Sequence, residues 1–150
     1  MTITATNSLE SINPATGEMV GSVPITPVDD IPKIATKARA AQPAWNALGL
    51  EGRLELMQPI AERLAAEVPN IGKLITAEMG KSTPEAHGEA NYGASQFANE
   101  LVSAFEAFQP EELTDKNTRS ILYRDPLGVS AAITPWNFPM LMPQQCILPS

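Results

Sequence analysis

Three side chains are candidates for chemistry: Asn137, the single cysteine Cys146 and the single histidine His87. A thiolate is a nucleophile and an imidazole a general base, whereas an asparagine amide donates hydrogen bonds without carrying a charge. His87 has no carboxylate or hydroxyl partner at a spacing typical of catalysis, so we expect a surface or packing residue. Cys146 lies in an apolar, helix-like segment with no basic residue beside it to lower its pKa, so we expect a buried small apolar residue.

Asn137 lies in a short loop in which Trp136, Asn137 and Phe138 stand between Pro135 and Pro139. An asparagine that follows a strand is commonly a loop-capping residue. The amide alone therefore leaves a capping role and a functional role open, and the flanking prolines and aromatic residues favour the functional one.

The segments on either side of this loop predict a strand and a helix. Val129 to Ile133 is an apolar run bounded by turn signals, which is typical of a strand buried on both faces. Pro135 cannot donate a ladder hydrogen bond, so the strand should end there. The apolar segment from Met140 towards Leu148 predicts a helix. Open α/β sheets bind ligands at the carboxyl ends of their strands, so we expect this loop to carry the function.

Helices are predicted through the middle of the chain. Thr26-Pro27-Val28-Asp29 is a helix start, and this helix should run to about Ala41 and end before Pro43. A second helix is expected from Leu50 to Val68 with a bend at Pro59, and a third from Asn70 to Met79, closed by Gly80. A fourth begins at Ser82, where Ser82 and Glu85 match a capping box, and runs to about Phe108. Its expected buried residues are Tyr92, Phe97, Leu101, Phe105 and Phe108.

Short strands are predicted near both ends of this helical region. Leu9 to Ile12 and Met19 to Val23 should pair around the Asn13–Gly17 turn. Pro110 to Thr118 is polar and predicts a surface connection, whereas Arg119 to Arg124 alternates in a way that suits a strand. The fold class is therefore α/β.

Composition excludes several classes of function. The formal net charge is −7, with 10 basic and 17 acidic residues. No cluster of basic residues is present, so we expect no nucleic-acid or anionic-membrane partner. We also expect no bilayer-spanning segment and no secretory signal, and therefore a cytoplasmic protein. A single cysteine allows neither an intramolecular disulfide nor a multi-cysteine zinc site, and we predict no metal site.

The loop and three further motifs carry a resemblance to a known family. Ile133-Thr134-Pro135-Trp136-Asn137-Phe138-Pro139 resembles the signature of the NAD(P)-dependent aldehyde dehydrogenase superfamily. In the same order as in that family, the other motifs are Asn13-Pro14-Ala15-Thr16-Gly17-Glu18, Glu78-Met79-Gly80-Lys81 and Asp125-Pro126-Leu127-Gly128-Val129. The similarity runs from about Ser11 to Ser150.

The resemblance implies oxidation of an aldehyde to a carboxylic acid by NAD or NADP. In that reaction a cysteine thiolate adds to the aldehyde, hydride passes to the nicotinamide, and water hydrolyses the thioester with a glutamate as general base. Asn137 matches the family's side-chain donor to the oxyanion. Ile133, Thr134 and Pro135 align with positions that line the cofactor cleft, largely through backbone atoms. Trp136 is predicted to contact the cofactor, and an apolar plug under the loop is the alternative. The family's nucleophile lies far downstream, and the position of Cys146 is often lysine in related chains.

Lys81, Glu85 and Glu89 are given no catalytic role. The two glutamates lie four residues apart on one predicted helix face, but their spacing after Gly80-Lys81 matches a structural motif of the family. Lys81 lies at the end of a predicted helix. It could bind a cofactor phosphate, but we expect a solvated lysine there. The chain has no Gly-x-Gly-x-x-Gly motif. The family binds phosphate through a later segment, so the choice between NAD and NADP stays open.

The expected organisation follows from the resemblance. Residues 1–150 should be the N-terminal part of the cofactor-binding domain: an N-terminal hairpin and helices that lead into the first strand of an incomplete Rossmann-like domain, without the catalytic domain. Residues 110–125 should belong to a ribbon that assembles subunits, and the full-length protein should be a homo-oligomer. These residues alone are predicted to be inactive. The alternative is a truncated, inactive paralogue that serves as an interaction module for full-length subunits.

Overall fold

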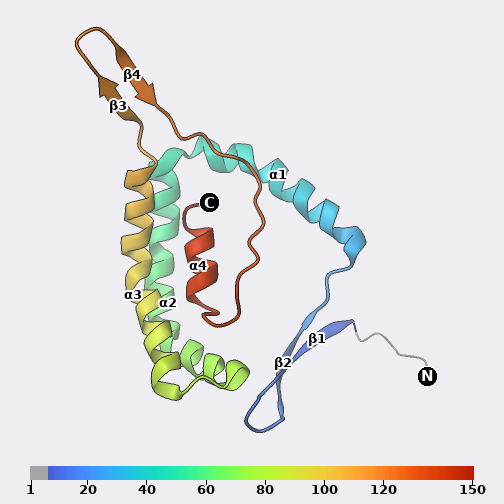
Figure 1. Cartoon of the computed structure of the whole chain (residues 1–150). Helices are drawn as coiled ribbons and strands as arrows, with labels where there is room; N and C mark the ends of the chain where they lie inside the picture. The colour runs from blue at the N-terminus through green and yellow to red at the C-terminus, as the bar shows by residue number, and fades with distance from the viewer. Residues whose placement is uncertain (1–6) are drawn as a thin grey trace.

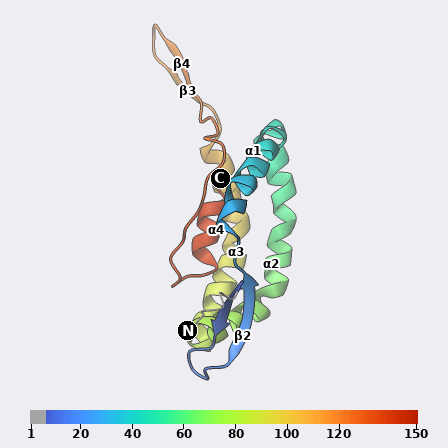
Figure 2. The same ribbon diagram turned by 90° about the vertical axis from the view of Figure 1, so that its right-hand side faces the viewer.

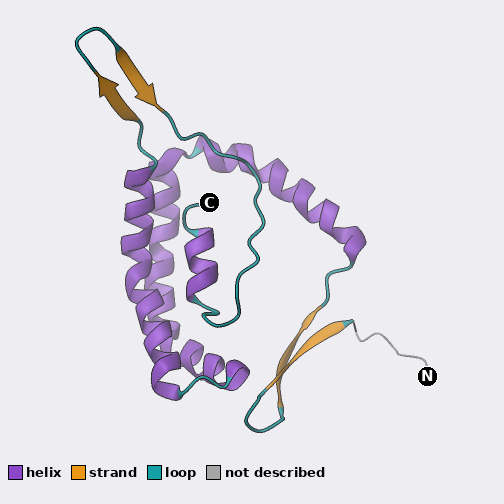
Figure 3. Ribbon diagram, viewed as in Figure 1, coloured by secondary structure: helices purple, strands orange, loops and turns teal. Residues whose placement is uncertain are grey.

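The computed structural model describes residues 7–150, which form helices and two small antiparallel sheets (Figures 1 and 3). In chain order the elements are β1 (Ser8–Ile12), β2 (Met19–Pro24), the 3-10 helix η1 (Val28–Asp30), α1 (Ile31–Ala47), α2 (Gly49–Met79), α3 (Thr83–Ala107), β3 (Glu111–Thr114), β4 (Arg119–Leu122) and α4 (Leu141–Ile147). The mixed α/β class and most of the predicted helices are therefore confirmed.

The core lies between α2 and α3, with α4 packed beside them (Figures 1 and 2). Phe97 and Leu101 of α3 are buried together with Leu148, which directly follows α4. The apolar stripe of α2 covers this cluster, as its three- and four-residue spacing predicts, through Leu54, Met57, Ile60, Ala61 and Leu64. Tyr92 was expected in the core, but it is exposed.

Pro43 and Pro69 do not separate helices as predicted, whereas Pro59 lies inside a helix as expected. Pro43 lies inside α1, and Pro59 and Pro69 lie inside α2, which is one continuous helix of 31 residues. A proline removes one backbone donor and crowds the preceding turn, at a typical cost of about 3 kcal/mol. The packing of α2 along α3 offsets this cost for Pro59 and Pro69. Gly80 ends α2 in the left-handed conformation, with φ of 72°, as predicted.

The strand expected at Val129 to Ile133 is not formed. Residues 123–135 are an irregular connection between β4 and α4 (Figure 3), and Ile133 is 98% exposed. A parallel strand exists only through hydrogen bonds to neighbouring strands. No strand within residues 7–150 lies beside this segment, since both sheets are separate two-stranded hairpins. The start of a Rossmann-like sheet was therefore a wrong prediction for the described residues.

The two hairpins form at the opposite ends of the helical region (Figure 1). In the first, Asn13 Oδ1 accepts hydrogen bonds from the backbone N–H groups of Ala15 (2.8 Å) and Thr16 (3.3 Å), which builds the predicted turn. In the second, β3 pairs with β4 from Glu111 opposite Leu122 to Thr114 opposite Arg119. The surface connection predicted at 110–118 thus contains a strand. Among the described residues, none of the helices combines the length and apolar character needed to cross a bilayer.

Candidate functional site

The loop of Trp136, Asn137 and Phe138 forms a tight turn directly before α4. Trp136 is 79% exposed, and Asn137 is exposed as well. Within residues 7–150 the amide group of Asn137 makes no hydrogen bond to another protein group. It is therefore available to donate to a ligand. Of the four residues predicted to line a cofactor cleft, only Thr134 is partly buried, and their cofactor role stays a prediction.

The backbone of Asn137 is held by Lys81. The Nζ atom of Lys81 donates a 2.9 Å hydrogen bond to the carbonyl oxygen of Asn137, and it lies 4.3 Å from the centroid of the Phe138 ring. The same nitrogen lies 2.6 Å from Glu89 Oε2. The Lys81 side chain is only 16% exposed. The prediction of a solvated helix-end lysine was wrong, because three partners from two other parts of the chain surround the ammonium group.

Glu89 joins this lysine to the start of α4. Its side chain is 2% exposed. While Oε2 accepts from Lys81, Oε1 accepts from the backbone N–H groups of Met140 (3.0 Å) and Leu141 (3.5 Å). The first N–H groups of a helix have no partners within the helix, so the carboxylate satisfies donors that would otherwise be unpaired. The structure thus separates Glu89 from Glu85, which is exposed and accepts a hydrogen bond from the Ser82 hydroxyl.

The rest of α4 is held against α3. The buried Gln144 donates from Nε2 to the Gly93 carbonyl oxygen (3.2 Å) and to Glu100 Oε2 (2.9 Å). A Cβ atom at Gly93 would lie 3.0 Å from Met140 Cε and 3.2 Å from Leu141 Cδ2. The small residue therefore allows α4 to approach α3 closely.

Cys146 is exposed to solvent, whereas His87 is half-buried between helices. Cys146 was predicted to be buried, but it is exposed. The reason is helical periodicity: α4 packs through Gln144 and Leu148, and a residue two positions from each points to the opposite face. His87 is half-buried and its ring lies against Gly72 of α2, which confirms a packing residue.

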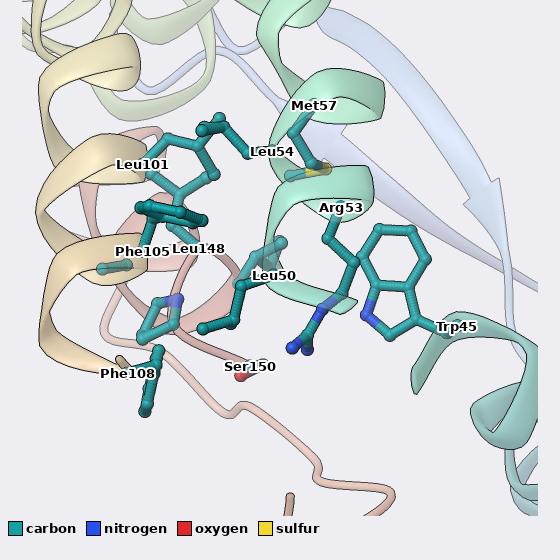
Figure 4. Close-up of a pocket in the computed structure, with 13 residues that line it drawn as sticks. Trp45, Leu50, Arg53, Leu54, Met57, Leu101, Phe105, Phe108, Leu148 and Ser150 are labelled. Carbon is teal, nitrogen blue, oxygen red and sulfur yellow. The ribbon is translucent and has the colours of Figure 1, made fainter. Parts of the chain in front are cut away.

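A separate apolar pocket lies at the other end of α4 (Figure 4). Its walls come from the start of α2, the end of α3 and the C-terminal residues, and it is lined mainly by Trp45, Leu50, Leu54, Leu101, Phe105, Phe108 and Leu148. Arg53 is its one charged residue, and its Nε donates to the Gly49 carbonyl oxygen at 3.1 Å. The pocket contains no acid–base pair. In the part of the chain that the structure describes, no group of three or more histidine, cysteine or acidic residues is placed to hold a metal ion.

Sequence reasoning selected Asn137 as a candidate and missed the two residues that hold its loop. Lys81 and Glu89 are 8 residues apart, and their partners in the loop lie more than 50 positions further on. A pattern of neighbouring residues in the sequence cannot predict a contact between residues so far apart. The one available signal was a lysine just before α3 and a glutamate in the first turns of that helix.

Comparisons with known proteins agree with the resemblance seen in the motifs. The model of the aldehyde dehydrogenase family matches residues 2–150. The non-phosphorylating aspartate-semialdehyde dehydrogenase of Halomonas elongata is 36% identical over 133 residues, which are 87% of this chain and 27% of that protein. The NADP(+) succinate-semialdehyde dehydrogenase of Escherichia coli K12 is 36% identical over 138 residues, 90% of this chain and 28% of that protein.

Solved structures give the same result. The succinate-semialdehyde dehydrogenase of Burkholderia pseudomallei superposes with a TM-score of 0.80 at 31% identity, covering 91% of this chain and 29% of that one. The aldehyde dehydrogenase of Brucella melitensis biovar abortus 2308 has a TM-score of 0.83 at 29% identity, over 95% of this chain and 30% of that one. The chain thus spans less than a third of the length of these relatives. Since the family model covers nearly all of it, the chain belongs to the aldehyde dehydrogenase family.

Proposed function

We propose that residues 1–150 are the N-terminal part of the cofactor-binding domain of a dehydrogenase that oxidises an aldehyde to a carboxylic acid with NAD or NADP. Asn137 is the residue of this chain that acts in the reaction. Its amide donates to the oxygen that becomes negatively charged when a thiolate adds to the aldehyde. A donor held ready for this charge requires no reorganisation during the reaction.

The arrangement of Asn137 is the observation that carries the proposal. Its backbone is fixed by Lys81 while its side-chain amide is exposed and makes no bond to the described protein. A loop-capping asparagine would instead use its side chain to bind the neighbouring backbone, as Asn13 does in the first hairpin. The bound nicotinamide would supply the hydride acceptor. Ile133, Thr134, Pro135 and Trp136 would form one wall of its cleft.

Two relatives inform the choice of cofactor and substrate. The glyceraldehyde-3-phosphate dehydrogenase of Bacillus halodurans C-125, 26% identical, is complexed with NADP, and the putative methylmalonate-semialdehyde dehydrogenase of Sinorhizobium meliloti 1021, also 26% identical, with NAD. Both cofactors should therefore be assayed. Relatives that match by sequence include several semialdehyde dehydrogenases, so semialdehydes are the first substrates to test.

The test is aldehyde-dependent production of NADH or NADPH by the protein that the gene encodes, followed by absorbance. We expect Asn137→Ala to lower kcat by about 100- to 1000-fold, as loss of an oxyanion donor does elsewhere. Asn99→Ala, an exposed asparagine of α3, is the matched control and should keep wild-type activity. A wild-type protein that oxidises no aldehyde, or an Asn137→Ala variant with unchanged kcat, would contradict the proposal. Residues 1–150 by themselves are expected to show no activity.

The β3–β4 hairpin favours a second role, in assembly. It projects from the helical region (Figure 1), and its apolar residues Leu113, Ile121 and Leu122, with the adjacent Tyr123, are exposed. We infer that this ribbon, within residues 110–125, pairs with other subunits of a homo-oligomer. The truncated-paralogue alternative predicts the same surface but no catalysis. Co-purification of an inactive chain with a longer dehydrogenase subunit would favour that alternative.

A further inference from the structure

We propose that the ion pair of Lys81 and Glu89 is a positioning device for the oxyanion donor: it fixes the Asn137–Leu141 segment and thereby sets the direction of the Asn137 amide. This proposal rests on the proposed function of Asn137. Neither residue of the pair touches the reacting atoms, so both are positioning residues and not catalytic ones.

The ion pair holds both ends of the segment. At one end, Lys81 Nζ donates to the Asn137 carbonyl oxygen (2.9 Å). At the other end, Glu89 Oε1 accepts from the N–H groups of Met140 (3.0 Å) and Leu141 (3.5 Å). Because Nζ and Oε2 are themselves 2.6 Å apart, the two anchors form one unit. These bonds restrict the conformations open to the backbone between them.

Phe138 adds a third contact in the middle of the segment. Its ring centroid lies 4.3 Å from Lys81 Nζ, in the range of a cation–π interaction. An ammonium group has three donors. Here they face a carboxylate, a carbonyl oxygen and an aromatic ring, all of which attract positive charge. These three contacts together restrain the position of the Lys81 ammonium group.

Burial sets this pair apart from the other ion pairs of the described chain. Lys33–Asp30, Arg119–Glu112 and Arg124–Glu111 all have side chains that are at least 39% exposed, whereas Glu89 is 2% exposed and Lys81 16%. Removing two charges from water is costly, so a buried pair is weak evidence for stability. Its better attested use is to specify one conformation. In this structure the conformation that it specifies is that of the Asn137 loop.

The side chain of Asn137 depends on this backbone. It makes no hydrogen bond of its own within residues 7–150, so the backbone, by placing the Cα–Cβ bond, decides which positions the amide can reach by rotation about χ1 and χ2. Catalytic geometry is sensitive to displacements of about 1 Å. A loop that is released at either anchor should therefore donate poorly although the amide is still present.

The first experiment uses residues 1–150 and measures amide hydrogen exchange at Met140 and Leu141 by NMR. Glu89→Gln has nearly the same shape, but Lys81 and Met140 donate to different oxygens of the carboxylate. In glutamine one of these positions is an NH2 group that donates and cannot accept, so one of the two contacts is lost. We expect exchange at both amides to accelerate about tenfold in Glu89→Gln and in Lys81→Met, the effect of losing a charge-assisted hydrogen bond. Lys81→Arg keeps the charge and the donors and should restore most of the protection.

Matched controls are available on the same helices. Glu106→Gln on α3 and Lys73→Met on α2 remove the same charges from exposed positions and should leave exchange at Met140 and Leu141 unchanged. Circular dichroism is used to check that each variant retains its helices. If Glu89→Gln and Lys81→Met are folded and exchange at the wild-type rate, the ion pair does not hold the loop and the proposal is wrong.

The second experiment is a double-mutant cycle on kcat in the protein that the gene encodes. We expect Glu89→Gln to lower kcat at least about tenfold with little change in KM, the pattern of an interaction made only in the transition state. In an Asn137→Ala background the same substitution should have no further effect, because there is no amide left to position. Equal effects in both backgrounds would overturn the positioning role. An Asn137→Ala variant with unchanged kcat would instead refute the proposed function, and hydrogen exchange would still decide whether the pair holds the loop.

Discussion

Lys81 and Asn137 are 56 positions apart in the chain, yet the lysine Nζ lies 2.9 Å from the asparagine carbonyl oxygen. The contact joins the turn between α2 and α3 to the loop before α4. Because the acceptor is a backbone group, any residue at position 137 would provide it. The contact fixes the loop and leaves the choice of side chain at 137 free for function.

Asn137→Asp tests the proposal that a negative charge forms beside this residue. Aspartate has nearly the same size and keeps the backbone contact to Lys81, so we expect an unchanged thermal midpoint. An ionised carboxylate cannot donate and would repel an oxyanion, so kcat should fall at least as far as in Asn137→Ala, about 100-fold or more. Steady-state kinetics near neutral pH measure the effect. An aspartate variant with near wild-type kcat would show that no negative charge develops there.

The sequence predicted the parts of the structure that depend on neighbours along the chain. The N-terminal hairpin, the α2 stripe, the glycine end of α2 and the start of α3 near Ser82 all follow from local spacing and turn chemistry. Asn137 was found because the residues that identify it are adjacent to it. The hypothesis about its role came from the resemblance of the motif to a known family and not from the chemistry of the residues alone.

The predictions that failed depend on distant partners. The strand at Val129 to Ile133 needs other strands beside it, and residues 7–150 provide none. Pro69, predicted to start a new helix, remains inside α2 because α3 packs along that helix. Lys81 was predicted to be solvated because nothing near it in sequence reveals Glu89, Asn137 and Phe138 as its partners. Each error has the same physical origin, which is that tertiary contacts override local preference.

Gly72→Ala should destabilise the packing of α2 on α3. A Cβ atom there would lie 2.6 Å from His87 Nδ1 and 2.8 Å from His87 Cγ, so the ring must move. We expect the free energy of unfolding to fall by about 1–3 kcal/mol, the usual range for overpacking, although alanine favours helices. Chemical denaturation measures this change.

Gly88→Ala is the control for that substitution. Gly88 lies in α3, and a Cβ atom there would have no neighbour within 4 Å. Alanine should therefore raise the free energy of unfolding by about 0.5–1 kcal/mol through its helix preference alone. Similar gains at both glycines would show that His87 and Gly72 are not in close contact. Adding His87→Ala to Gly72→Ala should recover part of the loss.

Gln144→Leu should loosen α4 from α3. The substitution keeps most of the side-chain volume but removes the amide that donates to the Gly93 carbonyl and to Glu100. We expect a loss of about 1–3 kcal/mol, the range for leaving buried polar groups without a partner. Thermal denaturation and amide exchange in α4 measure it. Gln145→Leu, at the exposed neighbouring position, is the control, and equal stability of the two variants would contradict the role of Gln144.

The β3–β4 hairpin should weaken in acid. Hydrogen bonds from the Arg119 guanidinium and then from the Thr114 hydroxyl lower the pKa of Glu112 below its ordinary value. Backbone N–H groups, of Asn117 first and then of Thr118, lower the pKa of Asp115 in the turn. Both carboxyl groups therefore bind protons less readily in the hairpin than in the unfolded chain. Their stabilisation is complete above the ordinary carboxyl pKa of about 4 and is lost as the pH falls through the lowered values.

Arg119→Gln separates the two causes. It removes the hydrogen bonds from Arg119, the largest cause of the lowered pKa of Glu112, so this pKa should rise towards its ordinary value. The pKa of Asp115 should stay low, because the donors to Asp115 are backbone groups. NMR titration of the two side-chain carboxyl groups measures both values in one sample. Lys116→Gln removes the same charge from the turn and should change neither, because Lys116 is the cause of neither shift. If Glu112 titrates at its ordinary value in the wild type, the pairing with Arg119 does not persist in solution, and the acid sensitivity of the hairpin must come from Asp115 alone.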